Sequence, residues 1–109
     1  MMLAKFFDLE NKSVFITGGG SGIGAEITKA FIQQGAKVSF VQRSDAEHFC
    51  DKVEAEFNSR PYFIKCDITD LNALKKAVEL ANSVNGDAEI LVNNCLLYTS
   101  DAADEKYRG

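Results

Sequence analysis

The chain of 109 residues has no tryptophan, one proline and only three cysteines. The cysteines (Cys50, Cys66 and Cys95) are odd in number and form no Cys-x-x-Cys pair, which argues against a disulfide framework and against a zinc site. No run approaches the ~18 consecutive apolar residues of a membrane span. The first ten residues contain three charged side chains that interrupt any signal-peptide core. We therefore expect a cytoplasmic, reducing setting and no membrane partner.

The charge pattern argues against nucleic acid as a partner. Acidic residues outnumber basic ones by 16 to 12, for a formal charge of −4, and the lysines are scattered along the chain. Without a basic stripe we expect no nucleic-acid partner. The hydrophobic content of 46% and the charged content of 26% are typical of a soluble globular domain.

Apolar segments of strand length alternate with segments of helical periodicity. Strands are predicted at 13–17, 37–42, 62–66 and 89–93, and helices at 22–34, 45–58 and from 71 to about 85. This order, βαβαβαβ, predicts an α/β fold with a parallel sheet of strand order 3-2-1-4, the first part of a doubly wound Rossmann fold. The strands are nearly continuous apolar runs, which predicts burial of both sheet faces.

Apolar spacing and capping residues predict how the helices pack and end. Ser44 or Asp45 is expected to cap the second helix, Thr69 or Asp70 the third, and Gly35 to end the first in a left-handed conformation. The predicted buried faces are Ile23, Ile27, Ala30 and Phe31 in the first helix, Phe49, Val53 and Phe57 in the second, and Leu71, Leu74, Val78 and Ala81 in the third.

A glycine-rich loop, TGGGSGIG at 17–24, joins the first strand to the first helix. Gly18 would let the chain turn off the strand, Gly22 would let the backbone approach a pyrophosphate, and Gly24 would let the helix pack closely on the strand. The helix N-terminus would present free N–H groups to the anion. A P-loop is excluded, because Ile23 stands where its lysine is required.

Together with two further motifs, this loop resembles the short-chain dehydrogenase/reductase family. The other motifs are CDIT at 66–69, after the third strand, and LVNN at 91–94, ending the fourth, so the resemblance covers residues 7–94. It implies binding of NAD or NADP and hydride transfer to or from a small carbonyl or alcohol substrate. It also implies that Asp67 and Ile68 hold the adenine and that Asn94 meets the ribose side. For Asp67, a plain loop carboxylate beside a helix start is the alternative.

The end of the second strand bears on the choice of cofactor. An acid there would bind the ribose 2′-hydroxyl of NAD, but the residue is the neutral Gln42, followed by Arg43. Arg43 can bind a 2′-phosphate, and Ser21 can add a hydrogen bond. These residues favour NADP. NAD remains open, because Asp45 is close enough in sequence to reach the ribose, and a solvated surface arginine is the alternative for Arg43.

The catalytic residues of the resembled family are absent from the chain. The resemblance implies a serine and a Tyr-x-x-x-Lys pair after the fourth strand, and none of Tyr62, Tyr98 and Tyr107 is followed by such a lysine. His48 is expected to be solvated, and Cys50 and Cys66 to be small packed residues. No residue of this chain is therefore predicted to be catalytic, none is predicted to bind metal, and the chain alone is predicted to be inactive.

For the whole protein we expect an NAD(P)-dependent oxidoreductase, most similar to sugar or polyol dehydrogenases. The 3-oxoacyl reductases share every motif, so they stay open as a second substrate class. A non-catalytic dinucleotide-binding module is the alternative, and a methyltransferase ranks lower because it lacks the acid and asparagine landmarks. We expect a homo-oligomer. The candidate cofactor-binding residues are Gly18, Gly20, Ser21, Gly22, Ile23, Gly24, Gln42, Arg43, Asp67, Ile68 and Asn94.

The last residues differ from the rest. The run CLLYTSDAADE at 95–105 is similar to an in-frame translation of a transposase adapter used in preparing DNA sequencing libraries. We therefore expect residues 1–94 to be the N-terminal cofactor-binding part of a Rossmann domain and 95–109 to be a non-native or unstructured tail. The fourth strand is then expected to present an unpaired apolar edge that promotes aggregation.

Overall fold

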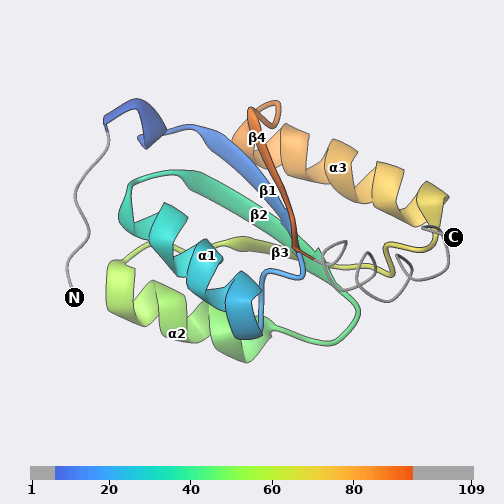
Figure 1. The fold of residues 1–109 in the computed structure, drawn as a ribbon, viewed down its shortest axis with the longest axis horizontal. Helices are drawn as coiled ribbons and strands as arrows, with labels where there is room; N and C mark the ends of the chain where they lie inside the picture. Colours follow the sequence, from blue (N-terminus) through green and yellow to red (C-terminus); the bar gives the residue numbers. More distant parts are fainter. Residues whose placement is uncertain (1–6, 95–109) are drawn as a thin grey trace, which may run out of the picture.

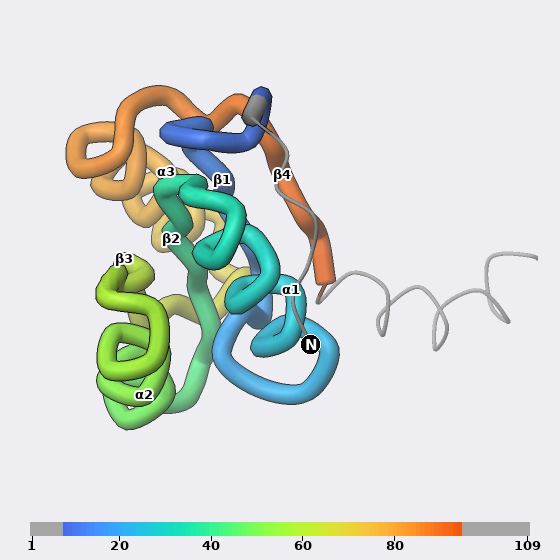
Figure 2. The backbone as a smooth tube through the Cα atoms, turned by 90° about the vertical axis from the view of Figure 1, so that its left-hand side faces the viewer, coloured from blue at the N-terminus to red at the C-terminus, as the bar shows by residue number. Residues whose placement is uncertain are grey.

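The computed structural model describes residues 7–94, which form a four-stranded parallel sheet between two helical layers (Figure 1). The strand order is β3-β2-β1-β4, as predicted, with β4 and β3 at opposite sides of the molecule (Figure 2). No described helix is long and apolar enough to cross a membrane. The elements are η1 (Phe7–Leu9), β1 (Ser13–Thr17), α1 (Gly22–Gln33), β2 (Lys37–Gln42), α2 (Glu47–Phe57), β3 (Tyr62–Lys65), α3 (Leu71–Asn85) and β4 (Ile90–Asn93).

The alternation of side chains along the strands divides the core into two layers. Val14, Ile16 and Phe40 belong to the cluster beneath α1 and α2, whereas Phe15 and Val41 belong to the cluster beneath α3. These side chains are at most 2% exposed, because successive residues of a strand point to opposite faces and both faces are covered. The two helical layers lie on opposite sides of the sheet in Figure 1.

The buried face of α1 matches the predicted one in part. Ile27 and Phe31 pack against the core, as predicted, while Ile23, expected in the core, is 59% exposed. The most buried residues of the helix are Gly24, Thr28 and Ile32. Apolar periodicity overlooked Gly24 and Thr28 because it gives little weight to glycine and threonine.

The packing of α3 shows the same effect. Leu71, predicted to pack on the sheet, is 76% exposed, and the most buried residues are Ala77 and Ala81. Leu74, Val78 and Ala81 do pack in this core, as predicted, whereas Ala77 was not predicted. The two alanines allow the helix to approach Phe15, whose large side chain fills the space beneath them.

The helix ends match the prediction in part. Asp70 caps α3 by accepting a hydrogen bond from Ala73 N, and Gly35 after α1 has the expected positive φ of 87°. The N-cap predicted for α2, Ser44 or Asp45, was wrong, because the N-cap residue is Ala46, which makes no side-chain cap hydrogen bond. Ser44 accepts hydrogen bonds from Gln42 instead, so its polar atoms face the strand end and not the helix.

The strand β4 is covered on one face only. Within the described residues β4 pairs only with β1, and Leu91 is 67% exposed on the face that carries α3. Ile90 and Val92, on the other face, pack against the core beneath α1. Burial of both faces is therefore confirmed for β1 and is wrong for β4, because α3 packs mainly on β1 and β2. Aggregation through this edge stays a prediction.

Glu89 ties the start of β4 to the start of β1. Its N–H donates to the Ser13 carbonyl at 2.9 Å, and its carboxylate accepts from Ser13 N at 3.3 Å and from Lys12 Nζ at 3.2 Å. The hydrogen bond from Ser13 N–H, followed by that from Lys12, holds the pKa of Glu89 below its ordinary value. Folding therefore favours the ionised carboxylate.

This pairing predicts a pH dependence of stability. Because the pKa of Glu89 is lower in the folded state, its contribution is present above the unfolded pKa of ~4.3 and is lost as the pH falls through the folded value. In Glu89→Gln, the free energy of unfolding measured with urea should fall less steeply between about pH 5 and pH 2 than in the parent. Glu26→Gln removes an exposed carboxylate of α1 and serves as the control. An acid slope unchanged by Glu89→Gln would contradict the prediction.

Candidate functional site

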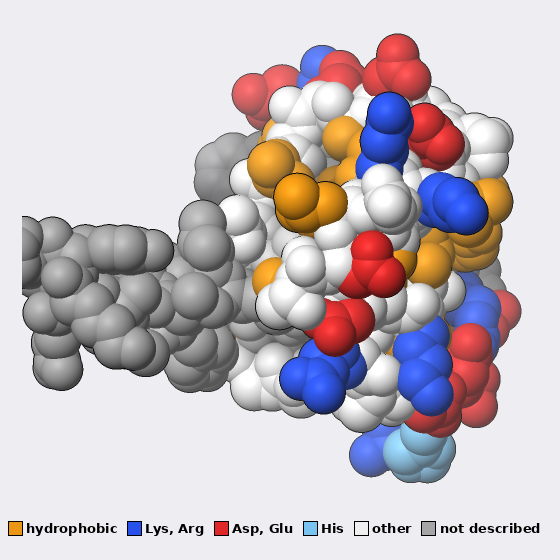
Figure 3. Space-filling model, turned by 90° about the vertical axis from the view of Figure 1, so that its right-hand side faces the viewer, with side chains coloured by type: hydrophobic (Ala, Val, Ile, Leu, Met, Phe, Trp, Pro, Cys, Tyr) orange, Lys and Arg blue, Asp and Glu red, His pale blue; other side chains and the backbone are white. Residues whose placement is uncertain are grey.

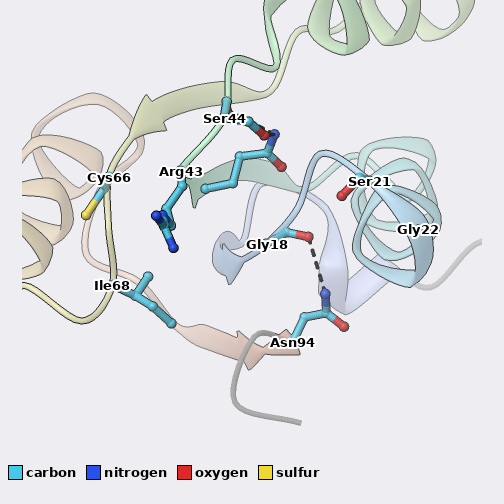
Figure 4. Close-up of a pocket in the computed structure, with 9 residues that line it drawn as sticks. Gly18, Ser21, Gly22, Arg43, Ser44, Cys66, Ile68 and Asn94 are labelled. Atoms are coloured by element: carbon cyan, nitrogen blue, oxygen red, sulfur yellow. Dashed lines mark hydrogen bonds between the residues drawn. The ribbon is translucent and has the colours of Figure 1, made fainter. Parts of the chain in front are cut away.

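A cleft of about 280 Å³ lies at the carboxyl ends of the strands (Figure 4). It lies at the point where the strand order reverses, with β2 on one side of β1 and β4 on the other, which is the usual ligand site of open α/β sheets. Figure 3 views the molecule from this edge and shows acidic and basic side chains intermixed, without a basic stripe. The cleft is lined by Gly18, Ser21, Gly22, Gln42, Arg43, Ser44, Cys66, Ile68 and Asn94.

The glycine loop between β1 and α1 is held from several sides. Gly18 N–H donates to the Val41 carbonyl at 2.7 Å, which extends the pairing of β1 with β2. Thr28 Oγ1 of α1 donates to the Gly19 carbonyl at 2.8 Å, and Gly20 N–H donates to Gln42 Oε1 at 2.9 Å. The loop is therefore fixed before any ligand binds.

Two glycines of this loop have opposite surroundings. A Cβ atom on Gly24 would overlap the Gly18 carbonyl oxygen, so only glycine lets α1 start this close to the end of β1. A Cβ atom on Gly22 would meet no atom within 4 Å, and its φ of +56° favours glycine. Gly24 thus allows the close packing of the helix on the strand, while Gly22 leaves the backbone open toward the cleft.

The N-terminus of α1 suits an anion. Its N-cap residue, Ser21, makes no side-chain cap hydrogen bond, and the first turn contains no acidic residue. By contrast, the carboxylate of Asp70 caps α3. The first N–H groups of a helix have no intrahelical acceptor and carry a partial positive charge. The α1 end therefore offers donors to a phosphate group, as its sequence predicted.

The opposite wall of the cleft comes from the ends of β2 and β3. Figure 4 shows the Arg43 side chain directed into the space between the glycine loop and Ile68. Asp67 does not line the cleft, and its Oδ1 accepts from Thr69 N–H at 3.0 Å and Thr69 Oγ1 at 2.7 Å. These two hydrogen bonds, and then the nearby charge of Arg43, lower the pKa of Asp67. The structure thus places the Asp67 carboxylate in the turn before α3, the alternative considered for this residue.

Asn94, at the end of β4, contributes an unpaired polar atom. The side chain is 4% exposed, and its Nδ2 donates to the Gly18 carbonyl at 3.3 Å, drawn as a dashed line in Figure 4. Its Oδ1 has no hydrogen-bond partner among the described residues. Leaving a buried acceptor unpaired costs free energy, so a ligand hydroxyl group that donates to this atom would bind favourably.

The two cysteines of the described region are buried thiols. Cys50 and Cys66 are free thiols, 1% and 7% exposed. Burial raises the pKa of Cys50 to about 11 and also raises the pKa of Cys66, so both thiols stay protonated near neutral pH. Both are small packed residues, as predicted. Within residues 7–94 no group of acidic, histidine and cysteine side chains is arranged to hold a metal ion.

The structure brings most of the predicted site residues to one cleft. Gly20, Ile23, Gly24 and Asp67 do not line it: the two glycines support the loop, Ile23 faces solvent and Asp67 binds Thr69. Ser44 and Cys66 line the cleft and were not predicted. Cys66 directly follows β3, and Ser44 lies two residues after β2. Their position just after the carboxyl end of a strand is the sequence signal that could have identified them.

Comparison with known proteins assigns the family. The sequence pattern described as short chain dehydrogenase matches residues 12–107. The chain belongs to the short-chain dehydrogenase family. The match runs past residue 94 into the segment expected to be non-native, and that expectation, which lies outside the described residues, stays a prediction.

Two relatives of this chain are named for dehydrogenation of a sugar. A probable galactose dehydrogenase of Rhizobium meliloti is 40% identical over 93 residues, covering 84% of this chain and 36% of that protein. A D-xylose 1-dehydrogenase of Caulobacter vibrioides is 39% identical over 97 residues, covering 86% of this chain and 37% of that protein. The chain therefore spans little more than a third of the length of these curated relatives.

Solved structures of the family share the fold. A short-chain dehydrogenase/reductase from Serratia marcescens has a TM-score of 0.70 and 37% identity, covering 79% of this chain and 36% of that one. L-sorbose reductase from Gluconobacter frateurii, complexed with NADPH and L-sorbose, has a TM-score of 0.72 and 31% identity, covering 78% of this chain and 33% of that one. The Rossmann-type fold predicted from the sequence is thereby confirmed.

Proposed function

We propose that the whole protein is an oxidoreductase that binds a nicotinamide dinucleotide in the cleft of residues 7–94. One observation carries this proposal: the residues at the N-terminus of α1 and Asn94, whose Oδ1 is unpaired, line the same cleft. The first suits a pyrophosphate and the second suits a ribose hydroxyl group. The bound cofactor would supply or accept the hydride in the interconversion of an alcohol and a carbonyl compound.

The chain's own residues would bind and orient the cofactor. The amide groups that start α1 would donate to the pyrophosphate, and the open side of Gly22 would let the phosphates approach the backbone. Ile68 would provide an apolar contact for the adenine. Asn94, held by Gly18, would accept a hydrogen bond from the ribose side.

We infer that NADP is favoured over NAD. No carboxylate stands at the end of β2, and Arg43 and Ser44 line the cleft there. Arg43 can donate two charge-assisted hydrogen bonds to a 2′-phosphate, with Ser21 and Ser44 as further donors. The NADPH bound to the related L-sorbose reductase supports the same choice.

For the substrate we propose a sugar or polyol, because the related galactose dehydrogenase, D-xylose 1-dehydrogenase and L-sorbose reductase are named for sugar substrates. A non-catalytic dinucleotide-binding module is the second candidate. Both candidates use the same cleft, and a serine followed by Tyr-x-x-x-Lys beyond residue 94 of the whole protein would favour the enzyme over the binding module.

Binding and turnover separate these functions. We expect the whole protein to bind NADPH in a calorimetric titration and to oxidise it with an aldose, a ketose or a 3-oxoacyl thioester, followed by nicotinamide absorbance. Binding without turnover of any of these compounds would support the binding module, and absence of NADPH and NADH binding would overturn the proposed function. The 109-residue chain alone should show no turnover, and NADPH oxidation above the blank would contradict that expectation.

A further inference from the structure

Gln42 connects three of the segments that surround the cleft. Its side-chain Oε1 accepts from Gly20 N–H in the glycine loop, and its Nε2 donates to the Ser44 carbonyl at 3.1 Å and to Ser44 Oγ at 3.2 Å. Its backbone carbonyl accepts from Cys66 N–H at 2.9 Å, at the end of β3. The glycine loop, the loop after β2 and the end of β3 thus meet at one residue.

The Gln42 amide makes its hydrogen bonds within the protein. Its Nε2 donates to two oxygens of Ser44, and its Oε1 accepts from Gly20 N–H. The orientation of the amide follows from Gly20, because a backbone N–H can only donate and therefore requires the oxygen of Gln42 on its side. The amide therefore connects the loop after β2 to the glycine loop.

The same bonds constrain Arg43. Gln42 and Ser44 flank Arg43 in sequence, so the hydrogen bond from the Gln42 side chain to the Ser44 carbonyl closes a short ring that contains the Arg43 backbone. Gly20 leaves room for this arrangement, since a Cβ atom there would meet the Gln42 amide and Ala46 Cβ. The backbone from which the Arg43 side chain enters the cleft is therefore held against the glycine loop.

We propose that Gln42 is a positioning residue that sets the selectivity of the site for a 2′-phosphate by fixing Arg43 relative to the glycine loop. This inference rests on the proposed dinucleotide site. Gln42 itself does not contact the phosphate. It holds the groups that do, and a side chain without the two donors at this position releases the loop after β2.

The test uses two variants of Gln42 and two nucleotide probes. Gln42→Met keeps the length of the side chain and loses the hydrogen bonds, whereas Gln42→Glu can still accept from Gly20 N–H but opposes the Ser44 carbonyl with a second oxygen. The affinities of the whole protein for adenosine 2′,5′-bisphosphate and for 5′-ADP are measured by calorimetry. Gln33→Met, at the far end of α1, is the matched control.

We expect Gln42→Met to reduce the ratio of the affinity for the 2′-phosphorylated probe to that for 5′-ADP by about tenfold. Gln42→Glu should reduce it further, because the added negative charge opposes the phosphate. In an Arg43→Ala background, Gln42→Met should change the preference by less than about twofold, since the two residues act as one unit. Hydrogen exchange at the Gly20 amide should be faster in Gln42→Met than in the parent and the control.

The outcomes distinguish this inference from the proposed function. If the parent binds neither probe and no NADPH, the proposed function fails. If the parent binds both probes but Gln42→Met and Gln42→Glu keep the parent's preference, the function stands and the inference is overturned. An equal loss of preference with and without Arg43 would also overturn it, because Gln42 would then contact the phosphate directly. Unchanged binding of 5′-ADP shows that a variant is folded.

Discussion

Gly24→Ala is expected to lower the free energy of unfolding of the whole protein by about 3 kcal/mol and to abolish dinucleotide binding. Gly24 is the buried residue at the start of α1, and a Cβ atom there would overlap the carbonyl oxygen of Gly18. Both partners are backbone, so no side chain can move aside to relieve the overlap. The helix would have to move away from β1, and the Thr28–Gly19 hydrogen bond and the cleft would be lost with it.

A matched substitution in the same loop separates stability from binding. Gly22→Ala adds a methyl group where nothing lies within 4 Å, so its cost in stability is limited to ~1–2 kcal/mol for the positive φ. That methyl group would stand at the open end of α1 and weaken phosphate binding in a folded protein. Urea unfolding and calorimetric titration of NADPH measure both quantities. Gly24→Ala with the stability and the NADPH affinity of the parent would contradict the structure.

Arg43→Ala is expected to weaken NADPH binding about 100-fold while changing NADH binding by less than about twofold. Arg43 lines the cleft and is directed into it, beside Ile68 (Figure 4). Its guanidinium group can form two charge-assisted hydrogen bonds with a 2′-phosphate, and NADH has no such group. The difference between the two cofactors therefore isolates the contribution of the phosphate.

Arg60→Ala is the control for this experiment. Arg60 forms ion pairs with Glu47, Asp51 and Glu54 along α2, and it does not line the cleft. Its removal should leave the ratio of NADPH to NADH affinity unchanged. An unaltered NADPH affinity in Arg43→Ala would show that Arg43 is a solvated surface residue, and the preference for NADP would then have to be abandoned.

The faces of the helices show where sequence periodicity succeeds and fails. Val53, Phe49 and Phe57 were predicted to pack and do pack, because α2 meets the sheet through large apolar side chains. In α1 and α3 most of the predicted residues also pack, but Ile23 and Leu71, in the first turns, are exposed. The buried Gly24, Thr28 and Ala77 were not predicted, because a pattern of large hydrophobic side chains does not report where small residues lie close to the sheet.

The binding site shows a similar division. That residues after β1, β2, β3 and β4 would meet could be predicted, because the carboxyl ends of parallel strands lie at one edge of a sheet. The partner of each side chain could not be predicted. Gln42 lines the cleft, and its side-chain amide binds Gly20 and Ser44, while the Asp67 carboxylate binds Thr69.

Local patterns along the chain were sufficient for the order of elements, the parallel sheet and the place of the glycine loop, because period, turn residues and capping act over a few neighbouring residues. The contacts that give the site its chemistry depend on residues far apart in sequence. Gln42 reaches Gly20 across 22 positions, and Asn94 reaches Gly18 across 76. Only the packing of β4 beside β1 and of α1 onto the strand ends determines which of their polar atoms are paired and which remain available to a ligand.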